Sequence, residues 1–539
     1  MKFIQLSKAT AMKVKFFFMK IFLLTTCSIA AHEVEDVKTK RPNIVVVLAD
    51  DMRTNYTGFE GHAIIKTPNI DKLASNGTVF IKGFATSAAC TPSRTSLLTG
   101  LYERRHGINF NSKSSMTEDA WSQTYPMILK DAGYFVGYVG KNHTPIGKNE
   151  AGVLGYKSGV MEQSFDYWYG SHKHLGFYPK DHKRHAIFNN AKAYTQIEIL
   201  EEGLENFMAP NEAFKAGYRF LDSRPKDKPF ALMINFNVPH SWGTESMQQR
   251  DSDLDLYKTV YRDKLSQVTI PETYVANKDI KTPKLPLDVY NGKYIKSYNY
   301  VKTPSTLKER KIREIQTISG IDKLLGKLVH HLEKQGISDN TIIVFTSDHG
   351  LMHGEFGLGG KVHLYEPSVR IPLVVYDPRM KQQKADKRHE LVALVDIAPT
   401  LLELTNTPVP AEMQGKSLKP LMKGDKPQWR QEIFLENMMT IQNYPRMEGV
   451  RTHKWKYVRY FDKKKDQPYA AMSVASINGE QPIYEELFDL ENDPHEISNL
   501  IAEPEYTDVV KELRNKNAVL VKEYRGNKPF NTHVNYVKQ

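Results

Sequence analysis

The sequence predicts an α/β protein, with a large domain built on a mostly parallel central sheet flanked by helices and a small α+β domain after it. Two observations support this fold class. Over 42–425, continuous apolar runs of strand length alternate with helical segments, which is typical of parallel sheets. Over 426–539, short strands follow one another before a single helix, without this alternation. We therefore expect a domain boundary near residue 425.

In the large domain, the expected strands are apolar runs that lack alternation, as strands buried on both faces do. Most of the expected helices end near glycines, which favour helix termination. Strands are expected at 44–49, 79–84, 134–139, 230–238, 341–347 and 371–376, and helices at 67–77, 90–99, 121–131, 314–335 and 396–404. In the small domain, we expect strands at 433–436 and 456–460 and a helix at 506–524.

The composition is that of a globular protein with a basic surplus. Apolar residues make up 40% and charged residues 25%, and the formal net charge is +12. A basic surplus favours an anionic partner, which could be nucleic acid or a sulfated or carboxylated polysaccharide. The chain has no nucleic-acid-binding motif and no concentrated run of Lys or Arg, so we expect the polysaccharide and no nucleic acid.

Residues 1–31 are expected to be a signal peptide. Lys13 and Lys15 precede a short apolar run, and small residues follow at 28–31. We therefore expect a periplasmic or secreted protein, with lipid anchoring through Cys27 as the alternative. The apolar run is too short and too interrupted to cross a membrane, and no later stretch is longer, so we expect no transmembrane span.

Residues 144–225 are irregular and rich in His, Tyr and Gly, while 241–312 are polar and poor in strands. Long insertions of this kind suit the wall of a binding site, where aromatic faces stack on sugars and imidazoles bond to hydroxyls. We expect His174 and Trp242 to contact sugar. The alternative is that the aromatic run at 167–169 belongs to the core.

Polar residues of the kinds that one site would need follow several of the expected strands. Since open α/β sheets bind ligands beyond the carboxyl ends of their strands, we expect these residues to share a site. Two adjacent carboxylates repel each other unless a cation lies between them. The residues are Asp50, Asp51, Lys141, His143, His240, Asp348 and His349, with Lys361 added from a loop.

Cys90 is one of two cysteines and the only one beyond the expected signal peptide, so it has no disulfide partner in the mature chain. Pro92 fits the first turn of a helix, which places Cys90 where backbone amides favour an anion. A small buried residue is the simpler interpretation of a lone cysteine. However, C-T-P-S-R at 90–94, followed by L-T-G at 98–100, resembles the signature of the formylglycine-dependent (type I) sulfatases.

This resemblance extends from residue 43 to about 500 and includes the segments 486–490 and 493–500, which resemble the sulfatase C-terminal domain. It implies the alkaline-phosphatase-like fold with a small C-terminal domain. It also implies that a formylglycine-generating maturation enzyme oxidises Cys90. The implied ligands of one divalent cation, usually calcium with magnesium as the alternative, are Asp50, Asp51, Asp348, His349 and the modified Cys90. His349 departs from the asparagine that is commonest in the family.

The resemblance further implies a covalent mechanism, in which the hydrated formylglycine attacks sulfur and the alcohol leaves. His143 is then the base of the second step, and Arg94 and Lys141 hold the hydrate. His240 and Lys361 bind the sulfate and assist the leaving oxygen, one of them as general acid. Trp242 stands where the family usually has proline, which puts the leaving-group geometry in question.

The sequence therefore favours a sulfatase that hydrolyses sulfate monoesters on a sulfated polysaccharide or oligosaccharide. Its basic charge and its insertions are similar in style to bacterial polysaccharide sulfatases, including those that act on algal sugars such as ulvan. A phosphonate or phosphate ester hydrolase of the alkaline phosphatase superfamily is the first alternative. A non-catalytic polysaccharide-binding protein, in which Cys90 is never oxidised, is the second.

Overall fold

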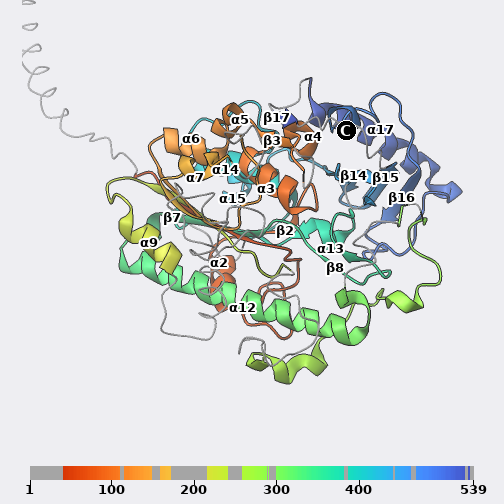
Figure 1. Cartoon of the computed structure of the whole chain (residues 1–539), viewed down its shortest axis with the longest axis horizontal. Coiled ribbons are helices and arrows are strands. Elements are labelled where there is room, and N and C mark those ends of the chain that lie inside the picture. The colour runs from red at the N-terminus through yellow and green to blue at the C-terminus, as the bar shows by residue number, and fades with distance from the viewer. Residues whose placement is uncertain are drawn as a thin grey trace, which may run out of the picture. The chain divides into compact units, whose positions relative to one another are not determined.

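A nine-stranded sheet is assembled from strands spread between residues 43 and 393 (Figure 1). Its strands are β1 (Asn43–Ala49), β2 (Thr78–Phe84), β4 (Phe135–Gly140), β5 (Tyr167–Gly170), β6 (Phe230–Asn235), β7 (Thr341–Ser347), β10 (Arg370–Ile371), β11 (Leu373–Tyr376) and β12 (Asp386–Ala393). The order is β10-β2-β11-β7-β1-β6-β4-β5, and β12 pairs with β2. Pairing is parallel except around β10 and β11, which confirms the mostly parallel sheet.

The computed structural model describes residues 40–109, 114–147, 158–170, 215–240, 258–287, 289–290, 299–380, 386–440, 443–462, 469–527 and 532–534. The expected signal peptide with Cys27, and also His174 and Trp242, lie outside the described residues. Residues 42–539 form one compact unit. Among the described helices, none is long and apolar enough to cross a membrane.

The central strand β1 shows why the apolar runs lack alternation. All of its residues are buried, and successive side chains enter two different cores. Ile44, Val46 and Leu48 pack with helices α3, α6 and α14 on one face of the sheet, and the intervening residues pack with α2 and α12 on the other (Figure 1). These helices are α2 (Pro68–Asn76), α3 (Cys90–Thr99), α6 (Tyr125–Asp131), α12 (Pro304–Lys334) and α14 (Ile397–Leu404).

Several expected elements differ from the structure. The helix expected at 121–131 is two helices, α5 (Glu118–Ser122) and α6, because the chain turns extended at Thr124 and Pro126 suits a new first turn. The strand expected at 371–376 is broken at Pro372, which cannot donate to a ladder, into β10 and β11. The strand expected at 230–238 ends at Asn235.

The long helix α12 begins at Pro304, ten residues before its expected start. Thr303 and Thr306 form a capping box there, and Pro304 occupies the first turn. The early turns bury charged side chains in ion pairs in place of an apolar stripe. In one of these pairs, Arg313 Nε lies 2.7 Å from Glu309 Oε1. Hydrophobic periodicity therefore could not mark this part of the helix.

A separate antiparallel sheet follows, with order β13-β14-β15-β16, as expected for an α+β segment. Its strands are β13 (Glu432–Asn437), β14 (Arg446–Thr452), β15 (Trp455–Phe461) and β16 (Tyr484–Asp489). Helix α17 (Thr507–Arg525) packs against β14 and β15 (Figure 1). The domain boundary near residue 425 stays a prediction.

Short elements complete the described chain. Two small sheets pair β3 (Ser114–Met116) with β17 (Thr532–Val534) and β8 (Met352–His353) with β9 (Gly359–Gly360). The short helices are α4 (Glu103–His106), α7 (Val160–Ser164), α9 (Lys215–Ser223), α13 (Glu366–Val369), α15 (Lys419–Met422) and α16 (Tyr469–Met472). Turns of 3₁₀ helix lie at Arg262–Gln267, Asn277–Asp279, Asn299–Val301, Ser338–Asn340, Leu394–Asp396 and Pro504–Tyr506.

Candidate active site

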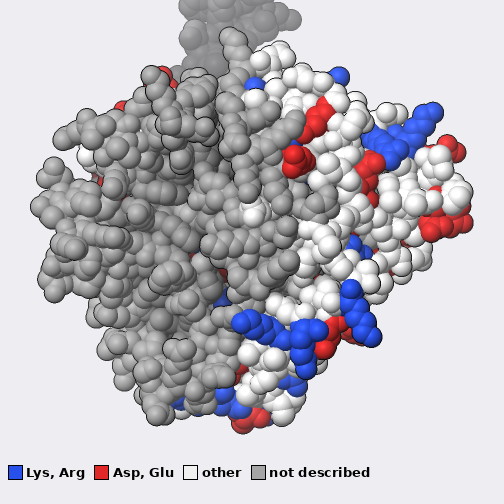
Figure 2. All heavy atoms as spheres, turned by 45° about the vertical axis from the view of Figure 1, so that its right-hand side comes forward, with Lys and Arg blue, Asp and Glu red and all other residues white. Residues whose placement is uncertain are grey.

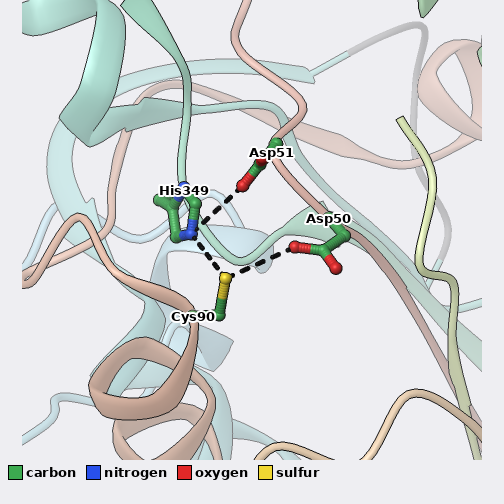
Figure 3. Close-up of side chains that lie close together, drawn as sticks. All are labelled: Asp50, Asp51, Cys90 and His349. Atoms are coloured by element: carbon green, nitrogen blue, oxygen red, sulfur yellow. Dashed lines mark hydrogen bonds and ion pairs between the residues drawn. The ribbon is translucent and has the colours of Figure 1, made fainter. Parts of the chain in front are cut away.

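The ends of β1, β4, β6 and β7 bring the expected site residues to one edge of the sheet. Ala49 is in register with Ser347, and Gly140 with Asn235, so the residues that follow these strands emerge side by side. Figure 3 shows Asp50 and Asp51 after β1, His349 after β7 and Cys90 at the start of α3, all directed at one point. The structure therefore brings these four side chains together.

Cys90 is the first residue of α3, as its sequence context predicts. Ala89 is extended before it, and Ser93 N makes an early helical hydrogen bond to Ala89 O at 3.0 Å. The helix ends at Gly100, whose φ of 67° is costly for a residue with a Cβ. The thiol of Cys90 is fully buried and forms no disulfide in the described chain.

Three ionisable side chains surround the Cys90 thiol. Lys361 Nζ lies 2.9 Å from Sγ, His349 Nε2 lies 3.3 Å from it, and Asp50 Oδ1 lies 3.6 Å from it. The other ring nitrogen of His349 lies 2.9 Å from the carbonyl of Gly350, so it can donate there and leave Nε2 directed at the site.

Asp50, Asp51, Cys90 and His349 form a group that could hold a metal ion, since one ligand atom from each lies within 4.8 Å of the others. Adjacent carboxylates with an imidazole are a donor set that suits a divalent cation. Asp51 adopts a φ of 65°, in the left-handed region that Asp and Asn enter more readily than most residues, and its carboxylate points at the group.

Asp348, also expected as a ligand, lies beside this group. Its Oδ1 accepts hydrogen bonds from the amides of Asp51 at 3.1 Å and of His349 at 2.9 Å. Its Oδ2 accepts from Arg94 Nε at 3.0 Å. Oδ1 is 3.6 Å from His349 Nε2, so the carboxylate faces the group while it also fixes both neighbouring backbones.

Lysine and arginine side chains neutralise the adjacent carboxylates in this structure. Lys141 is ion-paired with Asp50, and Arg94 Nη2 lies 3.7 Å from the same carboxylate. Burial alone would raise the pKa of Asp50, but Lys141, His240 and Arg94 more than offset it and hold that pKa well below its ordinary value. Both carboxylates are therefore charged at neutral pH.

Asp51 is balanced by a different lysine, and a histidine lies beside it. Lys361 Nζ lies 2.7 Å from its Oδ1, and His240 Nε2 lies 3.9 Å from its Oδ2. Against the effect of burial, Lys361 and His240 lower the pKa of Asp51. Burial lowers the pKa of His240 to about 3, whereas Asp348 overcomes burial at His349 and raises that pKa to about 9.

Lys141 is placed by a close approach between β4 and β6. Gly140 has a φ of 99°, and a Cβ there would lie 1.9 Å from the carbonyl oxygen of Asn235. The chain can therefore turn so that Lys141 N donates to that carbonyl at 2.7 Å and the ammonium enters the site. His143 follows and is buried in the same segment.

Asn235 is a site residue that sequence reasoning missed. Its Oδ1 accepts from Arg94 Nη1 at 3.4 Å. The apolar run continues past this residue to Val238, so the sequence did not place Asn235 at a strand end. His240 consequently lies in a loop five residues after β6 rather than directly after the strand.

Two rings of the aromatic run at 167–169 belong to the core, whereas the expected sugar contacts of His174 and Trp242 lie outside the described residues and stay a prediction. Trp168 and Tyr169 are buried within β5. The Trp168 ring stacks on Tyr138, with centroids 4.9 Å apart, and Tyr167 meets Phe220 edge-on.

Comparison with known proteins identifies the family of this chain. The sequence model of the family described as Sulfatase matches residues 42–407, and that of N-sulphoglucosamine sulphohydrolase, C-terminal, matches 354–471. N-acetylglucosamine-6-O-sulfatase of Bacteroides thetaiotaomicron is 28% identical over 91% of this chain and 88% of that protein. Ulvan-active sulfatase of Formosa agariphila is 26% identical over 96% of this chain and 89% of its own length.

Solved structures share the fold. One, in complex with its substrate D-glucosamine-2-N,6-O-disulfate, has a TM-score of 0.63 and 24% identity, and the match covers 91% of this chain and 99% of that one. Phosphonate monoester hydrolase of Agrobacterium radiobacter has a TM-score of 0.61 and 20% identity over 90% and 96% of the two chains. Because the family model matches more than half of the sequence, the chain belongs to the sulfatase family and is a sulfuric ester hydrolase.

Proposed function

We propose that this protein removes sulfate from an acidic sulfated polysaccharide or oligosaccharide, with Cys90 converted to formylglycine and one divalent cation, calcium, in the site. The observation that carries the proposal is the surroundings of Cys90. An ammonium, an imidazole and a carboxylate all lie within 3.6 Å of its Sγ in a fully buried position. A cysteine that only fills space has no need of ionisable neighbours, whereas a reacting group does.

The polysaccharide class is supported by the relatives and by the charge. Relatives named as an N-acetylglucosamine-6-O-sulfatase and an ulvan-active sulfatase are similar to this chain over most of its length. The net charge is +12, and on the face drawn in Figure 2 the described Lys and Arg residues form small groups interleaved with Asp and Glu. We take an algal polysaccharide such as ulvan as the finer proposal.

For the cation, we propose Asp50, Asp51, Asp348 and His349 as ligands, together with the modified side chain at position 90. Carboxylate oxygens suit calcium, or magnesium as the alternative. When present, the cation supplies Lewis acidity toward a sulfate oxygen and formylglycine supplies the nucleophilic oxygen. Removing the Lys361 ammonium from Asp51 would free that carboxylate for the cation and the ammonium for the sulfate.

The remaining residues have roles set by their position. Arg94 and Lys141 flank Asp50 and balance negative charge beside position 90. His143, two residues after Lys141, is our candidate for the base of the second step. His240 and Lys361 face Asp51 from the other side, and we assign them sulfate binding and protonation of the leaving oxygen. The negative sulfate would raise the low pKa of His240 and favour its charged form.

The experiment combines mass spectrometry with assay. Peptides containing Cys90, from protein made in its native host, should carry formylglycine, and this protein should desulfate members of a panel of sulfated oligosaccharides. A fully reduced thiol in active protein refutes the proposed nucleophile. Cleavage of aryl phosphonate esters in preference to the matched sulfate esters would support the phosphonate hydrolase, whose fold is shared.

We also propose that residues 1–31 direct export, so that the protein meets its substrate in the periplasm or outside the cell. N-terminal sequencing of protein from the native host checks this proposal. Limited proteolysis near residue 425 tests the proposed division into domains 42–425 and 426–539.

A further inference from the structure

We propose that Tyr300 and Arg310 are positioning residues that fix the backbone next to His240 and Lys361, and through them the leaving-group side of the site. This inference rests on the roles proposed above for His240 and Lys361. Tyr300 lies in the turn before α12, and Arg310 lies in the second turn of that helix. Their exposed fractions are 3% and 0%, so neither serves the surface.

Arg310 acts on the segment that carries His240. Its Nη2 donates to the carbonyl of Pro239, the residue directly before His240, at 2.8 Å. The guanidinium is held from two other directions, because its Nε donates to Glu314 Oε1 at 2.6 Å and its Cζ lies 5.2 Å from the Tyr300 ring centroid. A buried, fixed donor therefore sets the position of the backbone that ends in His240.

Tyr300 acts on the segment that carries Lys361. Its hydroxyl accepts from Gly360 N at 2.7 Å and donates to the carbonyl of Met352 at 3.1 Å. Met352 and Gly360 are partners in the β8–β9 pair, so one hydroxyl bridges both strands at the residue before Lys361. Directly after Lys361, Val362 has a φ of 85°, an unfavourable conformation for a β-branched residue that only its surroundings can maintain.

The two contacts converge from sites far apart in the sequence. Arg310 is 71 residues from Pro239, and Tyr300 is 60 residues from Gly360. The Tyr300 ring lies under the Arg310 guanidinium, so a shift of either residue would reach both segments. A purely structural role would require only that these side chains pack in the core. It would not require their polar atoms to hydrogen-bond to the two backbone segments that carry His240 and Lys361.

Tyr300→Phe is the main test, because it removes one oxygen and keeps the ring beneath Arg310. We expect kcat/KM for sulfate esters of poor leaving alcohols, such as sugar sulfates, to fall on the order of 10- to 100-fold through misplaced groups. The loss on 4-nitrophenyl sulfate should be under about threefold, since a good leaving group needs little protonation. KM for the aryl ester should change little.

Tyr274→Phe is the matched control. Tyr274 packs against the same small core cluster as Tyr300 and also donates its hydroxyl to a backbone carbonyl, that of Val301, at 3.0 Å. It should leave the ratio of the two activities unchanged. Arg310→Met should show the selective loss of Tyr300→Phe, and Arg310→Lys, which retains a donor for Pro239, should recover part of it.

His240→Ala gives the reference pattern for a lost leaving-group residue. The double variant His240→Ala/Arg310→Met should lose less than the product of the single losses, because Arg310 then has no imidazole left to position. Additive losses, equal losses on both esters, or no loss in Tyr300→Phe with unchanged thermal stability would each overturn the positioning role and leave the proposed function intact. A wild-type protein that carries formylglycine and cleaves no sulfate ester overturns both.

Discussion

Two of the buried charge groups in the described part of the chain invite comparison, one at the edge of the nine-stranded sheet and one between α4 and the four-stranded sheet. In the second, Arg104 donates to Glu436 at 2.7 Å, to Glu448 at 2.9 Å and to the carbonyl of Ser473 at 3.1 Å. Arg459 adds a 2.7 Å ion pair to Glu448. Both carboxylates accept from the shared Arg104 guanidinium, as in a structural network.

The two groups relieve like-charge repulsion in different ways. Glu103 lies near Glu436, and burial and that second carboxylate raise the pKa of Glu103 to about 8, so a bound proton removes the conflict. At the sheet edge, Lys141 and Lys361 instead keep Asp50 and Asp51 charged. Burial of charge therefore does not distinguish a site from a scaffold, but the retention of adjacent negative charges does.

The largest expected difference between the groups comes from Cys90→Ala. If the sheet edge is the active site, turnover of sulfate esters should fall by about 10⁴-fold or more, because the nucleophile is lost. Thermal unfolding should shift by only a few degrees, since one small side chain is removed. The measurement is kcat with calorimetry on the same sample, and substantial residual turnover in pure protein argues against Cys90.

The second-largest expected difference between the two groups is their response to the removal of divalent cations. Chelation should abolish activity and lower the unfolding temperature, because a bound cation stabilises the folded state, and calcium should restore both. Asp51→Asn should weaken this response to calcium, whereas Glu448→Gln should retain it. Full activity in exhaustively demetallated protein would falsify the cation assignment.

Arg104→Met should have the opposite profile from Cys90→Ala. It leaves Glu436 and Glu448 buried without their main partner, so the free energy of unfolding should fall by about 3–5 kcal/mol. The molecules that remain folded should keep their kcat/KM. Denaturant unfolding and active-site titration measure the two quantities, and a loss of kcat per folded molecule as large as that of Cys90→Ala would erase the distinction.

The smallest effect concerns pH. The folded-state pKa of Glu103, about 8, is above its ordinary value of 4.5, so its contribution to stability is full below about pH 4.5 and is lost as pH rises through 8. Glu103→Gln can keep the hydrogen bond with Ser87 without a charge. At pH 8 the variant should be more stable than wild type by about 1 kcal/mol or more, with no difference at pH 4. If the variant and the wild type are equally stable at pH 8 as well as at pH 4, the raised pKa of Glu103 is wrong.

The sequence predicted those elements whose signal is local. β1 and β7 are buried on both faces, and their continuous apolar runs located them and the Asp residues that follow. β12 was not predicted, because its first residues are polar and its burial comes from pairing with β2. The first turns of α12 were missed for a similar reason, because they bury charged residues. Arg310 is paired with Glu314, and Glu309 is paired with Arg313.

The site was predictable where residue type and strand end coincide, as at Asp50 and Lys141. It was not predictable where an ordinary residue gains its role from tertiary contact. Asn235 and Tyr300 carry no motif, and only the folded chain brings them to Arg94 and Gly360. Asp348 was expected only as a ligand, yet its carboxylate also holds Arg94 and two backbone amides.

The burial of Cys90 sets a time limit on its proposed modification. In the folded protein the thiol is inaccessible, and the residues that enclose it, His349 and Lys361, are 259 and 271 positions further along the chain. At a translation rate of about 5–20 residues per second, they emerge roughly 10–50 s after Cys90. During that interval the helix that begins at Cys90 has none of these partners, so the proposed maturation enzyme would act on the unfolded chain, before the sheet edge closes.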